Sequence, residues 1–409
     1  MTGRPLRFFR SPGNRGVYPI SLLFFFVIVL GWGPAVAVEW SMTPSVNLKE
    51  ELNDNIRMTP GKRELVWGNT LSPMLRVGGA TERLALRADL AANLSRYRGI
   101  EGLGSNDSSF RLSSQYQHRE QSRWGWEGSL LRDSTFRSEL RETGRVLAER
   151  RRSARTIGGF WEESPAERLS IRGEYRLTGV RYAEEGAGLF DYQTRTGSVD
   201  LTHLFSERDW ATVGLTLLHY RAPSARIRSI NAALQAGFTH LFSETLRLTV
   251  SVGGREVITD LSLPGGEITE RSRGLLGDLT IHKEFEATRW QGGARRRIDP
   301  SGSGYLLQVD HLFTTMERRI APTATVSLAA NAYHGRALRT NLPGGESRSF
   351  SVAPAWRWKW TEEWSMEVSY RYAWQKRDGG VAATSNALTW TVTYLGPKWT
   401  GGIEGMSAE

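Results

Sequence analysis

Residues 350–360, with the sequence FSVAPAWRWKW, decide the fold of this chain. Apolar residues occupy every second position of this stretch, and small or charged residues fill most positions between them. The pattern starts again over residues 364–375 and a third time over residues 388–394. Successive side chains of a β-strand point to opposite faces. The alternation therefore predicts three strands, each with one apolar face and one polar face.

The length of these runs distinguishes a sheet of a soluble protein from a sheet that spans a membrane. Strands of soluble proteins mostly have about five or six residues, whereas strands of about 9–11 residues cross a bilayer when tilted. Similar runs recur from the start of the mature chain onward, and we count about eighteen of them (16–18). An even number is typical of single-chain outer-membrane barrels. The sequence therefore predicts an all-β fold, a transmembrane antiparallel up-and-down β-barrel.

Composition agrees with a barrel and excludes a bundle of membrane helices. The 409 residues have a mean hydropathy of −0.40, which is too low for such a bundle, whereas a barrel hides its apolar residues in alternation. The formal net charge is +10, and removing the four arginines of residues 1–37 leaves +6. This charge is too modest to indicate a nucleic-acid partner.

The N-terminus has the pattern of a secretory signal. Four arginines precede an apolar run at residues 20–30, and Ala35-Val36-Ala37 fits a cleavage site. The apolar run is too short for a comfortable membrane span, although an uncleaved anchor is the alternative. We predict a signal peptide at 1–37 and one barrel domain at 38–409. The chain has no cysteine, which excludes a lipoprotein signal and any disulfide. Export without disulfides suits a Gram-negative outer membrane.

Two short repeats support a series of hairpins. The sequence THLFSE occurs at residues 202–207 and again at 239–244, and LPGGE occurs at 263–267 and again at 342–346. The first is a tight turn and the second a longer loop, and the two kinds alternate along the chain. Short periplasmic turns and longer external loops are typical of outer-membrane barrels. Both termini are therefore expected in the periplasm.

The polar face carries charges of both signs with arginine in excess. Barrels of this size are wide enough for an aqueous channel, and arginine on its wall favours anions or acidic sugars. The alternative is a solvated wall, paired across neighbouring strands without selectivity. The predicted pore-lining residues are Arg87, Asp89, Arg111, Glu127, Arg172, Glu174, Arg176, Arg247, Asp278, Arg295, Arg297, Asp310, Arg357, Lys359, Glu367 and Arg371.

Aromatic residues concentrate near the strand ends. Amphipathic rings at the membrane–water boundary explain this without a ligand, whereas a path of rings for sugar stacking would need them on the polar face. The predicted girdle consists of Trp210, Trp290, Trp358, Trp360, Trp364, Tyr372, Trp374 and Trp399.

The sequence indicates neither a metal site nor a cofactor. Four histidines near turns fall on every second strand, about 9–10 Å apart, which is too far to share one ion easily. An enzyme with an outer-rim histidine stays open as an alternative, with His219 or His334 as base. The hydroxyls and acids near them lack the spacing of a known hydrolase motif. The arginine-rich loop at 137–155 could constrict the pore, bind lipopolysaccharide phosphates or be solvated.

Both ends of the mature chain resemble a known family. The motifs are Pro44-Ser45-Val46, Glu51-Leu52-Asn53-Asp54-Asn55-Ile56, Leu71-Ser72-Pro73 ahead of an Arg83-led strand, Leu388-Thr389-Trp390-Thr391-Val392-Thr393-Tyr394 and Pro397-Lys398-Trp399. They are similar to outer-membrane porins found with exosortase and exopolysaccharide systems. The chain departs from general porins by continuing past its final strand. The resemblance implies a role near exopolysaccharide export and gives no catalytic residues.

Three hypotheses follow from these patterns. The first is a channel for hydrophilic solutes, passive or favouring anions or saccharides. The second is a conduit or accessory for exopolysaccharide secretion with periplasmic export partners, and the third is an outer-membrane enzyme. Outer-membrane lipid, lipopolysaccharide and the barrel assembly machinery are expected partners of any such barrel.

Overall fold

The computed structural model describes residues 38–61, 63–99, 103–135, 150–183, 188–264, 266–338, 345–377, 379–402 and 405–408. Among these residues no helix has the length and apolar character that a membrane crossing requires. The predicted signal peptide at 1–37 lies outside the described residues. One compact unit spans Glu39–Glu409.

The described residues of this unit form twenty strands. Their bounds are β1 Glu39–Asn53, β2 Val66–Ala80, β3 Leu84–Arg98, β4 Ser105–Arg119, β5 Ser122–Ser134, β6 Arg151–Ala166, β7 Leu169–Tyr182, β8 Tyr192–Leu204, β9 Asp209–Ala222, β10 Ile227–Ser243, β11 Leu246–Leu263, β12 Gly266–Glu284, β13 Thr288–Pro300, β14 Leu306–Ala321, β15 Ala324–Ala337, β16 Glu346–Lys359, β17 Trp364–Arg377, β18 Ala383–Leu395, β19 Trp399–Gly402 and β20 Gly405–Ala408.

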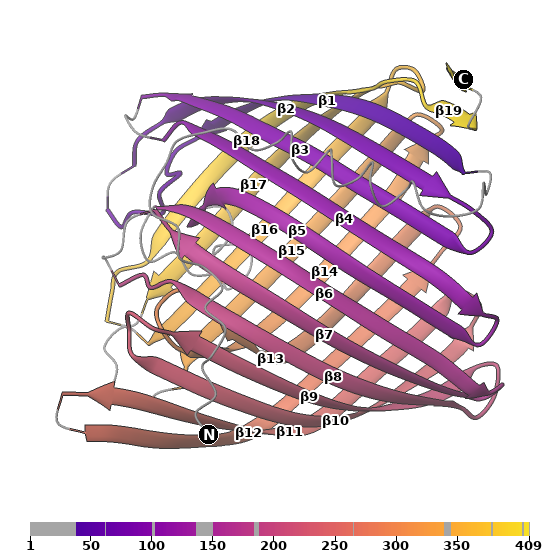
Figure 1. The fold of residues 1–409 in the computed structure, drawn as a ribbon. Coiled ribbons are helices and arrows are strands. Elements are labelled where there is room, and N and C mark those ends of the chain that lie inside the picture. The colour runs from indigo at the N-terminus through magenta and orange to yellow at the C-terminus, as the bar shows by residue number, and fades with distance from the viewer. Residues whose placement is uncertain are drawn as a thin grey trace. The chain divides into compact units, whose positions relative to one another are not determined.

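The sheet closes on itself. Each strand from β1 to β17 pairs antiparallel with the next one, and β18 pairs with β1, from Ser45 opposite Leu395 to Asn53 opposite Ala387. Figure 1 shows yellow β18 beside indigo β1. The short β19 continues along β1, with Trp399 opposite Met42, and β20 pairs with β19. The predicted fold is therefore confirmed as a closed up-and-down β-barrel of eighteen strands.

Alternation explains which side chains face outward. In β9, Val213, Leu215 and Leu217 are 48%, 47% and 51% exposed, and Thr212 and Thr216 lie on the opposite face. An exposed apolar band of this kind is unfavourable in water and favourable against hydrocarbon. The eighteen barrel strands have 13 to 19 residues, longer than the hydrocarbon alone requires, so their ends extend beyond it.

The two ends of the barrel have different connections. We call the end that joins even-numbered strands to the following odd-numbered ones the turn end, and the opposite end the loop end. Both THLFSE copies lie at the turn end, where they lead from β8 into β9 and from β10 into β11. The first LPGGE copy joins β11 to β12 at the loop end, and most of the second lies outside the described residues.

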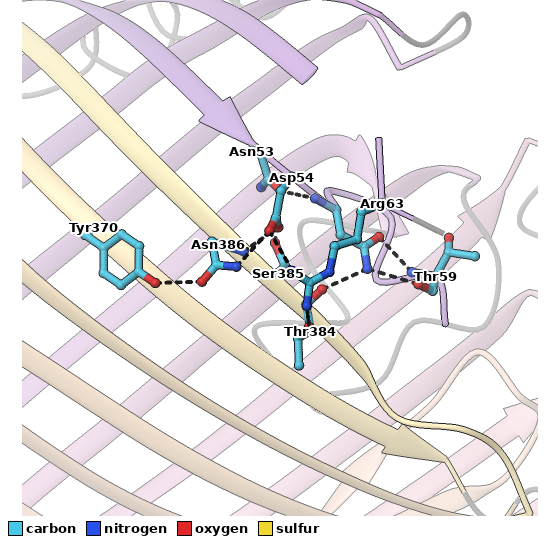
Figure 2. Close-up of polar contacts among 9 residues, drawn as sticks. Asn53, Asp54, Thr59, Arg63, Tyr370, Thr384, Ser385 and Asn386 are labelled. Carbon is cyan, nitrogen blue, oxygen red and sulfur yellow. Dashed lines mark hydrogen bonds and ion pairs between the residues drawn. The ribbon is translucent and has the colours of Figure 1, made fainter. Parts of the chain in front are cut away.

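Polar contacts hold the seam between β1 and β18 at the loop end (Figure 2). The backbone N–H of Asn386 donates to Asp54 Oδ1 at 2.6 Å, and its side-chain amide donates to Asp54 Oδ2 at 2.7 Å. The Tyr370 hydroxyl donates to the Asn386 side chain at 2.6 Å. Arg63 reaches Asp54 at 3.6 Å and the Thr384 hydroxyl at 2.8 Å. The first loop is thereby tied to the last strands.

Candidate functional site

The inner face of the barrel is a charged wall in which arginines pair with acids. The closest N–O distances are 2.7 Å between Arg357 and Glu367, 2.6 Å between Arg295 and Asp278, and 2.8 Å between Arg87 and Asp89. The first two pairs are direct register neighbours on adjacent strands. Cross-strand pairs of opposite charge are a normal stabilising unit of antiparallel sheets.

A second group of paired charges spans β5, β6 and β7. Glu162 accepts hydrogen bonds from Arg123 at 2.8 Å and from Arg172 at 3.1 Å. Arg176 reaches Glu127 and Glu174, each at 2.7 Å. Several of these side chains are about 40% exposed, so each pair contributes little stability, and the wall stays hydrated.

The structure places every predicted pore-lining residue except Asp310 on the inner face. The register of neighbouring strands shows that these residues share one face of the sheet and that the exposed apolar residues lie on the other face. The inward-facing residues are Arg87, Asp89, Arg111, Glu127, Arg172, Glu174, Arg176, Arg247, Asp278, Arg295, Arg297, Arg357, Lys359, Glu367 and Arg371.

Asp310 requires a correction. It lies on the outer face of β14, which it shares with Leu312, and it pairs there with Arg296 at the loop end. The prediction assumed that the apolar residues Leu307 and Val309 face lipid. They point inward instead and are 1% and 0% exposed, because the loop end of the lumen contains packed apolar side chains.

The predicted aromatic girdle has one member on the wrong face. Trp210 shares the inner face of β9 with Thr212 and pairs in register with Thr239, whose hydroxyl bonds Thr249 inside the barrel. Only its position at a strand end had suggested the girdle. Trp360 lies in the turn between β16 and β17. The other predicted members lie on the outer face: Trp290, Trp358, Trp364, Tyr372, Trp374 and Trp399.

Aromatic rings of the turn end contact one another. Trp356 stacks on Trp358 at 6.2 Å between centroids, Trp360 meets Trp358 edge-on at 5.8 Å, and Trp364 lies 4.8 Å from Tyr394. Their exposed positions at the border of the apolar band match the interfacial role of such rings.

A cavity of about 530 Å³ lies along one side of the lumen, and we call it the polar cavity. It lies against β1, β2 and β3 on one side and against β15, β16 and β17 on the other. Its lining is rich in charged, amide, hydroxyl and phenol groups, including Lys49, Glu51, Asn93, Asn331, Tyr333 and Arg371. Sites of this composition can hydrogen-bond a hydroxyl-rich solute.

The charges of the polar cavity form a small network. Lys49 lies 2.6 Å from Glu51, and Arg371 lies 3.9 Å from the same carboxylate. The Asn53 amide also donates to Glu51 at 3.1 Å. Two cations face one acid, so this network carries a net charge of +1.

An apolar cluster fills the opposite side of the lumen at the loop end, and we call it the luminal cluster. Its buried members are Val180, Tyr182, Leu189, Tyr192, Leu218, Tyr220, Ala222, Ile227, Val257, Leu261 and Leu306. They come from β7 to β11, from β14 and from the loop between β7 and β8. Burial of this kind is the ordinary driving force of a protein core.

Two loops fold inward to complete this cluster. The Tyr220 hydroxyl donates to the Ser301 carbonyl at 2.8 Å, and the Phe190 N–H donates to the Gly302 carbonyl at 2.7 Å. A side chain at Gly302 would collide with the ring of Tyr182. The connection between β13 and β14 therefore packs against β7 and β9. The open space of the polar cavity lies on the side of the lumen that this cluster leaves unfilled.

The sequence contained a signal for the luminal cluster that the strand pattern obscured. Leu217 and Leu218 are adjacent, and so are Leu306 and Leu307, which breaks strict alternation. One member of each pair must face inward. Apolar residues on both parities near a strand end therefore indicate an inward plug.

The groups considered for catalysis do not converge. His219 lies on the outer face of β9, and Ser229 lies on the inner face of β10, where it bonds Thr259. His334 contacts Glu346 at 2.9 Å on the outer face. Among the described residues, no three His, Asp or Glu side chains gather to hold a metal ion.

Of the four histidines that the sequence places near turns, His203 and His240 face outward, whereas His282 and His311 face inward. His240 bonds Asp209 at 2.7 Å on the outer face, whereas His311 stacks on Tyr333 inside at 4.1 Å between centroids. Most of the arginine-rich loop at 137–155 lies outside the described residues. Its last part begins β6, where Arg152 is buried against Asp133.

No family model matches the chain. No curated protein matches it. Among solved structures it is similar to OccK9 (OpdG) of Pseudomonas aeruginosa, with 13% identity and a TM-score of 0.46 over 87% of this chain and 98% of that one. It is also similar to OccK2 (OpdF) of Pseudomonas aeruginosa, with 13% identity and a TM-score of 0.45 over 90% and 98%.

A further similar structure is the unliganded ferric citrate transporter FecA, with 11% identity and a TM-score of 0.48 over 85% of this chain and 61% of that one. The closed eighteen-strand sheet, with its apolar outer face and charged inner face, defines this protein as a transmembrane β-barrel.

Proposed function

We propose that this protein is an outer-membrane channel for hydrophilic solutes that favours anionic saccharides. The observation that carries the proposal is the polar cavity, which follows the wall opposite the luminal cluster and presents Lys49 and Arg371. The loop end faces outside and the turn end faces the periplasm, since short turns mark the periplasmic side of such barrels.

The chemistry of the cavity explains the solute class. Amide and hydroxyl groups exchange hydrogen bonds with sugar hydroxyls, and Tyr97 and Tyr333 offer ring faces. The net positive network of Lys49, Glu51 and Arg371 attracts a carboxylate or phosphate. Arg371 can form the bidentate contact that such groups prefer.

The test is single-channel conductance in planar bilayers under a salt gradient. The wild-type protein is expected to give steady steps with anion preference. The R371E variant changes the network from +1 to −1 and is expected to shift the reversal potential toward cations. R168E makes the same charge change at the exposed turn between β6 and β7 and is expected to leave most of the anion preference. A silent bilayer with folded protein would contradict the channel.

Exopolysaccharide secretion is the second candidate, with periplasmic export proteins as partners at the turn end. Its support is the resemblance of both chain ends to porins of exosortase systems, together with a cavity suited to sugars. Deleting the gene should then abolish surface polymer, and the R371E variant should restore less polymer than R168E. Normal polymer after deletion would remove this role and leave the channel.

The proposal includes no catalytic step. Support comes from the separation of His219 and Ser229 onto opposite faces. The same proposal includes two earlier steps. The signal peptide is cleaved after residue 37, and the barrel assembly machinery then inserts the protein into a Gram-negative outer membrane.

A further inference from the structure

Arginines are distributed differently on the two faces of the barrel. On the inner face most of them contact acids, as in the Arg357–Glu367 pair. On the outer face of β5 to β10, six exposed arginines near the loop end have no ion pair or hydrogen bond to the described residues. We call them the arginine belt, and its members are Arg132, Arg155, Arg181, Arg195, Arg221 and Arg228.

Strand register brings these arginines together. Arg221 lies directly opposite Arg228 on β10 and opposite Gln193 on β8. The same row continues through Gly179 to Arg155 on β6. Adjacent strands are about 4.8 Å apart, so this row carries several like charges within a short arc. Like charges at this spacing repel one another and favour a bound anion.

The remaining members extend the belt by one row on each side. Arg132 and Arg181 both flank Ser153, one row farther toward the loop end. Arg195 pairs with His219 one row nearer the apolar band. Over these rows the outward-facing residues described in β5 to β10 include no acid. One outward acid, Asp260 on β11, lies opposite Arg228 at the edge of the belt, so the belt keeps an excess of positive charge.

The belt lies at the edge of the apolar band. Ile157 and Ile230 are 59% and 46% exposed, and each is two residues from a belt arginine on its strand. Two residues of a strand span about 7 Å. The occupant of this surface therefore has to present anionic groups directly above hydrocarbon. A soluble protein would not meet both requirements, whereas a phosphorylated lipid does.

We infer that the arginine belt binds the phosphates of lipopolysaccharide in the outer leaflet. Guanidinium groups bind phosphate oxygens in a bidentate manner, and closely spaced arginines suit a lipid that carries more than one phosphate. The belt covers one sector of the barrel. Elsewhere on the outer face, three arginines of β12, β13 and β16 are paired with acids, as Arg273 is with Glu256 at 2.9 Å.

These paired arginines provide a matched control. Arg273, Arg296 and Arg348 lie on the outer face near the loop end and contact Glu256, Asp310 and Glu346. The test compares R155Q/R221Q/R228Q with R273Q/R296Q/R348Q. Both triple variants lose three positive charges from the outer face, and neither changes a residue of the inner face.

The measurement is a titration of folded protein in neutral detergent with fluorescent deep-rough lipopolysaccharide. Each belt arginine is worth about fivefold in affinity for an anionic lipid surface. The belt variant is therefore expected to bind about a hundredfold more weakly, and the control variant within about threefold of wild type. Heat-modifiable migration on gels checks that each variant is folded.

A second arm changes the ligand and leaves the protein intact. Enzymatically dephosphorylated lipopolysaccharide should lose most of its affinity for the wild-type protein, and phosphatidylglycerol vesicles should bind more weakly than lipopolysaccharide. Equal loss in both triple variants, or equal binding of lipopolysaccharide and phosphatidylglycerol, would overturn the inference. Undiminished binding of the dephosphorylated lipid would overturn it as well.

Discussion

Tyr220 on β9 donates a hydrogen bond of 2.8 Å to the carbonyl of Ser301, which lies 81 residues away in the connection between β13 and β14. The tyrosine ring is fully buried, with 0% exposure. This bond ties an inward-folded connection to a distant strand and thereby keeps one side of the lumen filled.

Replacing Tyr220 should enlarge the pore. In Y220A, loss of the ring removes a large part of the luminal cluster, and truncations of this size in packed cores cost about 3–5 kcal/mol. The connection at 301–305 should then leave the lumen, and single-channel conductance should rise. Y220F removes only the hydrogen bond, worth about 1 kcal/mol, and should change conductance much less. Unchanged conductance in Y220A would show that the cluster does not restrict the pore.

Gly302 offers a second way to displace the same connection. Any side chain there would collide with the ring of Tyr182, so G302V is expected to raise conductance as Y220A does. Gly254 on the outer parity of β11 has no neighbour within 4 Å of an added Cβ, and G254V is the control that should leave conductance unchanged. A normal pore in G302V would count against tight packing at this contact.

Removing Glu367 should make the channel more anion-selective. Arg357 is half exposed and pairs with Glu367 on the neighbouring strand. In E367Q the arginine loses its counter-charge, so the wall becomes more positive, and anions are favoured. An exposed pair contributes about 0–1 kcal/mol, so the melting temperature should hardly change. The double variant R357Q/E367Q should return the reversal potential toward wild type, and failure to do so would mean that this pair does not face the conducting path.

The seam between β1 and β18 should be sensitive to Asp54. Its carboxylate accepts hydrogen bonds from the backbone and side chain of Asn386 and lies near Arg63. D54A leaves these donors without a partner, and the free energy of unfolding should fall by about 1–3 kcal/mol. Urea unfolding in detergent measures it. Y370F removes one bond at the edge of this network and should cost less than D54A; equal costs would show that Asp54 has no special role.

The N-terminus of the exported protein is predicted to be Val38. Mass spectrometry of protein purified from outer membranes should detect a chain lacking residues 1–37, because Ala35-Val36-Ala37 fits a cleavage site. A chain that retains these residues would show an uncleaved anchor.

The barrel could be predicted from sequence because alternation in the membrane-spanning part is strict. Val213, Leu215 and Leu217 face outward while the residues between them face inward, and lipid requires this separation along every strand. The strand number followed from counting such runs, and most charged residues fell on the expected face for the same reason.

The luminal cluster could not be predicted by the same rule. Near the loop end the apolar face turns inward, so Val309 is buried inside and Asp310 faces outward. Which connections fold into the lumen depends on contacts such as that between Phe190 and Gly302, and strand periodicity carries no information about them. The polar cavity is what this packing leaves open, and it was not visible in sequence either.

The pairing of β1 with β18 has a consequence for how the barrel folds. Asp54 and Asn386 are separated by 332 residues. The strand β1 therefore cannot pair with β18, its second neighbour, until nearly the whole chain is present. Until then β1 has one unpaired edge, and exposed edges recruit other strands. Contacts of such long sequence separation also form slowly. We therefore expect the incomplete barrel to be prone to aggregation until the last hairpin pairs with the first strand.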